Sequence, residues 1–142
     1  MKSIILAGAF LLLAFTKSFA ADVNVSPSVL RTFQTSFSNA TAVQWSVVDN
    51  VYRADFTIDG EKTIAFFNIA DGSLVATSCY ITVQDLPRVL QRSLKTHTSS
   101  AAVMEVFEVQ GNESLDYYVT IRQADKTTIL KSGSTEWIVY KK

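Results

Sequence analysis

The sequence predicts an α+β fold made of a tandem α-β-β-β-β repeat. We expect an antiparallel, about eight-stranded sheet with two helices on one face and the other face open. Three observations lead to this prediction. A short motif recurs about sixty residues apart, the apolar spacing in each copy changes from a helical to a strand period, and Asp-Gly pairs mark tight turns.

The internal repeat is visible in short matching segments. "PSVL" at 27–30 returns as "PRVL" at 87–90, and "DFTI" returns as "YVTI" at a slightly larger offset. The larger offset is what an insertion in a loop of the second copy would produce. We therefore expect one domain at 21–142, made of two repeats at about 26–80 and 82–142.

The first copy opens with a helix signal. Ser26 is a suitable N-cap, and Pro27 occupies the first helical position, where its missing N–H costs nothing. The apolar residues that follow fall on one face of a helix. They are Val29, Leu30, Phe33 and Phe37.

The second copy opens in a similar way. Thr82 and Asp85 have the spacing of a capping box. Leu86, Val89, Leu90 and Leu94 then continue an apolar stripe that ends at His97. We interpret His97 as a packing residue at the edge of the core, because no partner at useful spacing supports a metal-ligand role.

After each helix the apolar residues alternate with polar ones, which predicts half-buried strands. Asp59-Gly60 and Asp71-Gly72 supply residues that tolerate positive φ and so favour hairpins. The short turns favour antiparallel pairing of consecutive strands. The expected strands are 43–48, 51–58, 62–68, 73–80, 103–110, 115–122, 127–131 and 135–141.

The N-terminus has the pattern of a secretory signal peptide. Lys2 precedes an apolar run from Ile4 to Phe15, and small residues follow at 18–20. We expect residues 1–20 to be removed by cleavage after Ala20. The protein is then periplasmic or secreted.

The charge and the single cysteine narrow the possible partners. Removing Lys2 and Lys17 from the 13 basic residues leaves 11 against 13 acidic ones, a formal charge of −2. This charge gives no reason to expect nucleic acid, and no second long apolar segment suggests membrane insertion. Cys79 is the only cysteine, so it cannot form an internal disulfide. We interpret it as a half-buried strand residue of a monomer. The alternatives are a Cys79-linked dimer and a reactive thiol.

The order of several motifs resembles the exported PepSY-like proteins of Bacteroidetes, which are described as similar to the β-lactamase inhibitor protein. The motifs are "FSNATAVQW" (37–45), "Y-x-A-x-F" (52–56), "A-F-F" (65–67), "L-x-A-T-S-x-Y" (74–80) and "LP-x-x-L" (86–90). The resemblance implies the tandem fold, an envelope or secreted location and no enzymatic activity. It also implies action through the open sheet or as a small domain that holds an enzyme inactive.

The residues themselves also give no indication of enzymatic activity. The sequence contains none of the common nucleophile, zinc, phosphate-loop or dinucleotide motifs. Asp55, Asp59 and Glu61 could pair their carboxylates, but two of the three lie in or beside a hairpin turn, where Asp serves backbone geometry. We therefore expect no catalytic residue, no metal site and no cofactor.

The open sheet face is the remaining candidate for a site. Strand alternation places Arg53 and Asp55 on the open face of the sheet, and Tyr52 and Phe56 on the face that the helix covers. Tyr and Arg are enriched where proteins bind each other. Truncating Tyr118 or Arg53 to alanine is expected to weaken the binding of a partner and leave folding intact, although such residues also serve sheet stability. Trp45 and Trp137 are expected in the core. The candidate partner-binding residues are Arg53, Asp55, Phe67, Tyr118, Thr120, Arg122 and Tyr140.

The sequence leaves three classes of function to consider. The sequence favours an exported, non-catalytic binding module that holds a protein or peptide, such as an enzyme to be inhibited, on the open face. The alternative is a small-ligand-binding periplasmic protein with a pocket between helices and sheet, but large apolar residues such as Phe33 and Phe56 fill that space. An enzyme would need convergent titratable groups, which the sequence does not offer.

Overall fold

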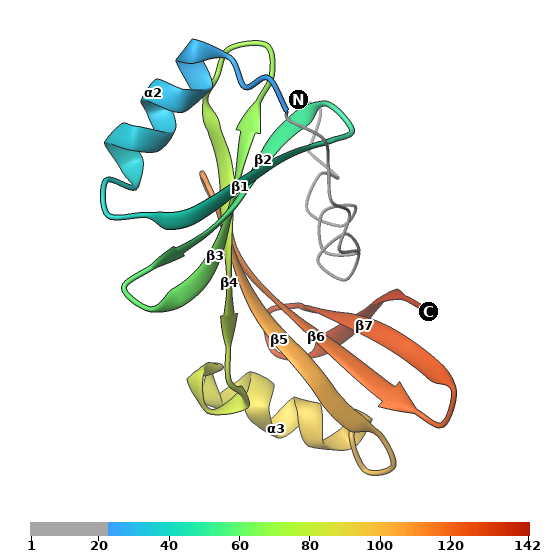
Figure 1. Cartoon of the computed structure of the whole chain (residues 1–142). Helices are drawn as coiled ribbons and strands as arrows, with labels where there is room; N and C mark the ends of the chain where they lie inside the picture. Colours follow the sequence, from blue (N-terminus) through green and yellow to red (C-terminus); the bar gives the residue numbers. More distant parts are fainter. Residues whose placement is uncertain (1–22) are drawn as a thin grey trace. The chain divides into compact units, whose positions relative to one another are not determined.

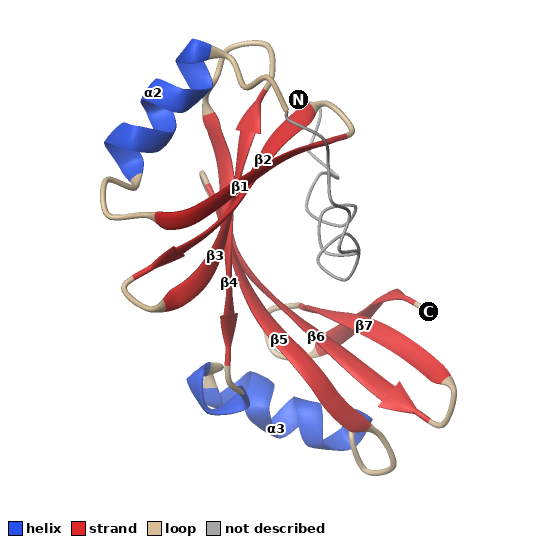
Figure 2. Ribbon diagram, in the orientation of Figure 1, coloured by secondary structure: helices blue, strands red, loops and turns tan. Residues whose placement is uncertain are grey.

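The computed structural model describes residues 23–142, so the predicted signal peptide and its cleavage site lie outside the described residues. The described residues form two α-helices and eight strands, whose arrangement Figures 1 and 2 show. The strands form one open antiparallel sheet in the order β1 to β8, which confirms the predicted fold class. The elements are α2 (Pro27–Ser36), β1 (Thr41–Val48), β2 (Val51–Ile58), β3 (Glu61–Asn68), β4 (Leu74–Ile81), the 3-10 turn η2 (Val83–Asp85), α3 (Arg88–His97), β5 (Ala102–Gly111), β6 (Leu115–Gln123), β7 (Lys126–Ser132) and β8 (Trp137–Lys141).

The chain divides into two compact units within β4. The first unit ends at Thr77 and the second begins at Ser78. Within residues 23–142, each unit has one α-helix, which packs on one face of its own strands (Figure 2). No helix of the same unit among these residues covers the other face of those strands, and we call it the helix-free face.

Tight turns connect the strands of the first unit. β2 and β3 pair antiparallel from Val51↔Asn68 to Ile58↔Glu61, so only Asp59 and Gly60 remain to form the turn. Both residues have positive φ, at 51° and 83°, as the Asp-Gly pair predicted. The edge strand β1 is irregular: Ala42 has positive φ, and the register with β2 shifts between Thr41 and Gln44.

The core of the first unit is largely aromatic. Phe33 of α2 inserts between the rings of Phe56 and Trp45, with centroids 5.1 and 5.2 Å away. Ser26 is the N-cap of α2 and Pro27 opens the helix, as predicted, although the Ser26 hydroxyl makes no capping hydrogen bond to the helix backbone. The helix is thus held in place mainly by packing.

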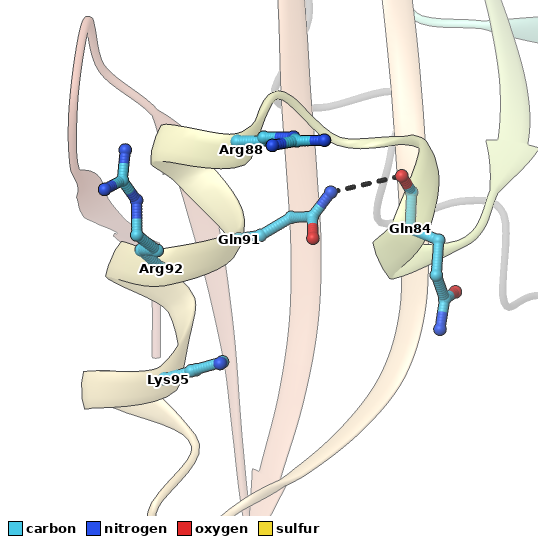
Figure 3. Close-up of a pocket in the computed structure, with 5 residues that line it drawn as sticks. All are labelled: Gln84, Arg88, Gln91, Arg92 and Lys95. Atoms are coloured by element: carbon cyan, nitrogen blue, oxygen red, sulfur yellow. Dashed lines mark hydrogen bonds between the residues drawn. The ribbon is translucent and has the colours of Figure 1, made fainter.

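The start of the second helix differs from the prediction. The capping box of Thr82 and Asp85 is present, but it caps the short turn η2, and α3 begins only at Arg88. Pro87 explains the difference, because the residue before a proline is disfavoured in helical conformation and Leu86 is extended, with ψ at 150°. The Gln91 side-chain amide donates to the Gln84 carbonyl and so joins η2 to α3 (Figure 3).

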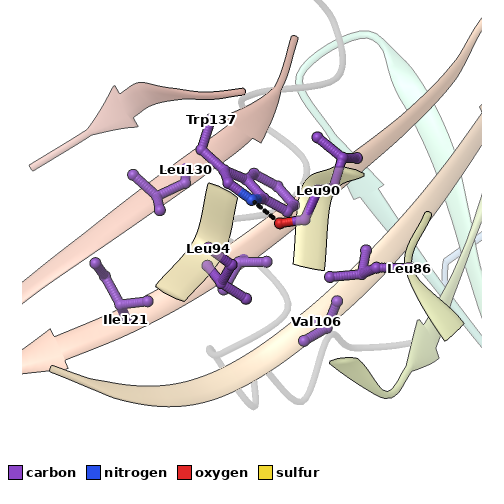
Figure 4. Packing of buried hydrophobic residues seen from close by; sticks show 8 residues of the cluster. Leu86, Leu90, Leu94, Val106, Ile121, Leu130 and Trp137 are labelled. Atoms are coloured by element: carbon purple, nitrogen blue, oxygen red, sulfur yellow. Dashed lines mark hydrogen bonds between the residues drawn. The ribbon is translucent and has the colours of Figure 1, made fainter. Parts of the chain in front are cut away.

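The core of the second unit is aliphatic and surrounds one tryptophan. Leu86, Leu90 and Leu94 face the strands and pack with residues of β5 to β8 (Figure 4). Trp137 is buried among them, and its indole N–H donates to the carbonyl oxygen of Leu90 at 2.9 Å. This bond fixes α3 against β8 and satisfies the only polar group of a buried tryptophan.

Candidate functional site

In the first unit, the register of β2 separates two sets of side chains. Ala54 and Phe56 lie on the face that α2 covers. Arg53 and Asp55 lie on the helix-free face, as predicted, with Arg53 between Ser46 of β1 and Phe66 of β3. Apolar residues surround this pair on the same face, and they form a small cluster of Val48, Val51, Ile64 and Phe66.

Arg53 is not the exposed contact residue that the sequence suggested. Only 7% of its surface is exposed. Its Nε and Nη2 atoms donate to the two carboxylate oxygens of Asp55 at 2.8 and 2.6 Å, which is a bidentate ion pair. The positive charge is therefore neutralised inside the unit, and Asp55 presents the more accessible end of the pair.

The prediction that Phe67 belongs to the helix-free face is wrong. Phe67 is fully buried and its ring lies 5.7 Å from Trp45 and 6.2 Å from Phe33, on the face covered by α2. The reason is the alternation of β3, in which Ala65 and Phe67 face the helix. Phe66 therefore occupies the helix-free position that was assigned to Phe67.

In the second unit, strand β6 is divided as predicted. Val119 and Ile121 face α3, and Tyr118 and Thr120 lie on the opposite side. Tyr118 is nevertheless only 1% exposed, and Thr120 is also buried. Arg122, near the end of the strand, is exposed. The face assignment is correct, but the helix-free face is covered by its own side chains.

Aromatic rings form a row across this face. Tyr80 of β4 contacts Phe107 of β5, with centroids 4.4 Å apart. Phe107 is paired with Tyr118 in the β5–β6 register, and Tyr118 meets Tyr140 of β8 edge-on at 5.6 Å. We call Tyr80, Phe107, Tyr118 and Tyr140 the aromatic row. Tyr80 is 40% exposed, so one end of the row is open to solvent.

Two charged side chains border the row. The Lys131 ammonium lies 5.7 Å from the centre of the Tyr118 ring and 3.4 Å from the carboxylate of Asp116. The ammonium thus has a carboxylate and an aromatic face as neighbours. The positive charge of Lys131 is thus balanced by Asp116 beside the row.

Two buried polar atoms near the row lack hydrogen-bond partners among residues 23–142. They are the Tyr118 hydroxyl and Oε2 of Glu105, which is paired with Thr120 on the same face. Burial, with smaller contributions from Asp116 and Tyr140, raises the pKa of Tyr118. Burial also raises the pKa of Glu105. The Tyr118 hydroxyl and Glu105 Oε2 are thus covered atoms whose hydrogen-bonding capacity is unused within the described chain.

The raised pKa of Glu105 predicts a specific pH dependence. A carboxyl whose pKa is higher in the folded state favours folding when protonated, so its contribution is lost as the pH rises from its ordinary value of 4.5 through the folded pKa. Glu105→Gln should remove this loss and make the variant more stable than the parent above that range. Urea denaturation across acidic and neutral pH tests this. A Glu113→Gln control on an exposed loop should keep the parent profile; an equal response of the two variants would contradict the prediction.

The sequence did not identify Phe107, Tyr80 or Glu105 as members of the site. Residues 103–110, "VMEVFEVQ", carry apolar side chains at both parities, so alternation cannot decide whether Val106 or Phe107 faces the helix. Cys79, next to Tyr80 in β4, is half-buried, as its interpretation as a strand residue suggested.

This chain resembles known proteins in its fold and not in its sequence. No family model matches the chain, and no curated protein sequence matches it. Solved structures do match. A BLIP-like protein from Bacteroides fragilis superposes with a TM-score of 0.70 at 19% identity, over 86% of this chain and 91% of that one.

Two further structures share the fold. A protein from Bacteroides eggerthii, provisionally described as periplasmic, has a TM-score of 0.76 at 19% identity over 82% of this chain and 87% of its own. A DUF2874 family protein from Bacteroides ovatus has a TM-score of 0.73 at 21% identity over 85% and 87%. The resemblance to BLIP-like proteins predicted from the motifs is thus confirmed as a likeness of fold. No helix within residues 23–142 is long and apolar enough to cross a membrane.

Proposed function

We propose that this protein is an exported, non-catalytic binding module that holds a protein or peptide partner on its helix-free face. The observation that carries the proposal is the aromatic row beside two buried polar atoms without partners, Tyr118 Oη and Glu105 Oε2. Aromatic side chains with polar tips supply much of the energy of protein–protein contacts.

A partner could supply the hydrogen bonds that the Tyr118 hydroxyl and Glu105 Oε2 lack. A buried polar group without a hydrogen bond costs about 1–3 kcal/mol, and a partner that supplies the missing bond removes that cost. Both atoms are covered in the free protein, so the partner must displace the side chains above them to form these bonds. The Tyr118 hydroxyl then donates to a carbonyl or carboxylate of the partner, and Glu105 accepts from an N–H or an ammonium group. A polypeptide loop offers both kinds of group side by side. The rings beside them add apolar contact area.

The fold supports the same proposal and extends it. The structural neighbour from Bacteroides fragilis is called BLIP-like, and the sequence motifs resemble proteins related to an enzyme inhibitor. We therefore propose that the partner is an enzyme of the cell envelope or the medium and that binding inhibits it. Export rests on the N-terminal signal pattern and on the neighbour described as periplasmic.

A small-ligand carrier fits the structure less well. Such a protein would need space between a helix and its strands. In the first unit, aromatic rings fill the space between α2 and the strands. The centre of the Phe33 ring lies within 6.2 Å of the ring centres of Phe37, Trp45, Phe56 and Phe67. In the second unit the corresponding layer holds packed leucines and Trp137.

Two matched phenylalanine variants test the proposal. Tyr118→Phe removes only the unpartnered hydroxyl from the helix-free face. Tyr52→Phe removes a hydroxyl that donates to the Asn24 carbonyl on the side of α2. Residues 21–142 of the parent and of both variants are used to capture proteins from the envelope and medium of the native host, read by mass spectrometry.

The expected result is one protein retained by the parent and by Tyr52→Phe and depleted about tenfold or more with Tyr118→Phe, the effect of losing one well-made hydrogen bond. A captured enzyme is then assayed for inhibition. Equal capture by all three proteins would contradict a role for the Tyr118 hydroxyl. Capture of nothing by folded parent at low and moderate salt would overturn the binding module in favour of the small-ligand alternative.

A further inference from the structure

The outer side of α3 carries a concentrated positive charge. The ten residues of this helix include Arg88, Arg92 and Lys95 and no Asp or Glu. All three basic side chains are exposed. Together with Gln84 and Gln91 they line an open hollow of about 630 Å³ on the surface (Figure 3).

This hollow is built on a fixed scaffold. The Gln91 amide donates to the Gln84 carbonyl at 3.1 Å and to the Leu86 carbonyl at 2.8 Å, which ties η2 to the first turns of α3. On the opposite side of the helix, Leu90 and Leu94 are buried in the core. Binding therefore needs to order only the ends of the basic side chains, which keeps its entropic cost small.

The positive charge is not neutralised by the rest of the described chain. Within residues 23–142 the ion pairs are those of Arg53 with Asp55 and Lys131 with Asp116, and neither involves α3. The nearest carboxylate in sequence, Asp85, accepts hydrogen bonds from the Thr82 backbone N–H and hydroxyl at 2.8 and 2.7 Å. The basic side chains are thus available to an external anion.

The spacing of the charges indicates an extended ligand. Arg88, Gln91 and Lys95 follow one another at helical spacing and point to one side of α3, whereas the Arg92 side chain points away from them (Figure 3). Seven residues of helix separate Arg88 from Lys95, a rise of about 10 Å. An extended polypeptide rises about 3.3 Å per residue, so a segment of about four residues spans the row, and two carboxylates on alternate residues, about 7 Å apart, fit along it.

We propose that the outer face of α3 binds an acidic segment of a protein partner, held by Arg88, Arg92 and Lys95. This surface lies on the opposite side of the second unit's strands from the aromatic row, so the proposal does not depend on the function of that row. A protein segment is favoured over a lipid surface because the apolar residues of α3 face the core. The outer face therefore has nothing to insert into a bilayer.

The test uses a fluorescent peptide of alternating glutamate and serine and measures its binding to residues 21–142 by anisotropy at low salt. The variant is Arg88→Gln/Arg92→Gln/Lys95→Gln. The matched control, Arg31→Gln/Lys62→Gln/Lys126→Gln, removes the same number of exposed basic charges elsewhere. Circular dichroism verifies that both remain folded.

We expect the α3 variant to bind the peptide about tenfold more weakly than the parent, and the control to change by less than about twofold. Added salt should weaken the parent's binding, because the contacts are exposed ion pairs. Equal losses in the two variants would overturn the proposal and show a general charge effect. Binding of the parent to vesicles of phosphatidylglycerol and phosphatidylcholine, lost only in the α3 variant and without peptide binding, would overturn it in favour of a membrane surface.

Discussion

Phe33→Ala is expected to lower the free energy of unfolding by about 3–5 kcal/mol. Phe33 is only 7% exposed, and it is the residue of α2 that touches the most aromatic rings of the first unit. The nearest of these rings belong to Phe56 and Trp45. Truncation leaves a cavity between the helix and the strands that surrounding rings cannot fill without leaving their rotamers.

Urea denaturation followed by tryptophan fluorescence measures this effect, since Trp45 lies against Phe33. Phe33→Leu, which keeps most of the volume, should cost only about 1 kcal/mol. Gln34→Ala, on the exposed side of the same helix, should change stability by less than about 0.5 kcal/mol. A loss below about 1 kcal/mol for Phe33→Ala would show that α2 is not anchored through this side chain.

Tyr118→Ala is expected to destabilise the protein by a similar amount, about 3–5 kcal/mol. This result would differ from the expectation drawn from the sequence, in which Tyr118 was a surface residue whose truncation spares the fold. The structure buries its ring between Phe107, Tyr140 and Lys131. Loss of the ring thus removes the centre of the aromatic row and not only a possible contact with a partner.

Tyr118→Phe separates the ring from its hydroxyl. Because the hydroxyl has no hydrogen-bond partner among residues 23–142, its removal should leave stability unchanged or raise it by about 1 kcal/mol. Thermal and urea denaturation of the two variants are compared in one buffer. A large loss with Tyr118→Phe would show that the hydroxyl is satisfied in solution, and a small loss with Tyr118→Ala would show that the ring is exposed there.

The local features of this fold could be predicted from the sequence because they depend on neighbouring residues. Asp59-Gly60 determines a two-residue turn, and that turn fixes the register of β2 with β3. The strand boundaries follow from the same turns. The later start of α3 depends on Pro87, a local signal that outweighed the capping box before it.

The candidate site was harder to predict because its composition depends on contacts between distant strands. Residues 64–67 are apolar at every position, so the pattern could not decide which of Phe66 and Phe67 faces the helix. The burial of Tyr118 depends on Phe107 and Tyr140, which come from two other strands. Its position on the strand was correct, but its exposure could not be known.

The strand order has a consequence for how the chain folds. Because the eight strands follow one another in the sheet as they do in the sequence, every ladder except that of β4 with β5 closes only a short loop; the β4–β5 connection contains η2 and α3. Loop-closure entropy is therefore small within each unit, and folding can proceed hairpin by hairpin from a tight turn. Such a topology favours rapid folding for a protein so rich in strands. A chain that crosses a membrane unfolded would then acquire its structure soon after it emerges.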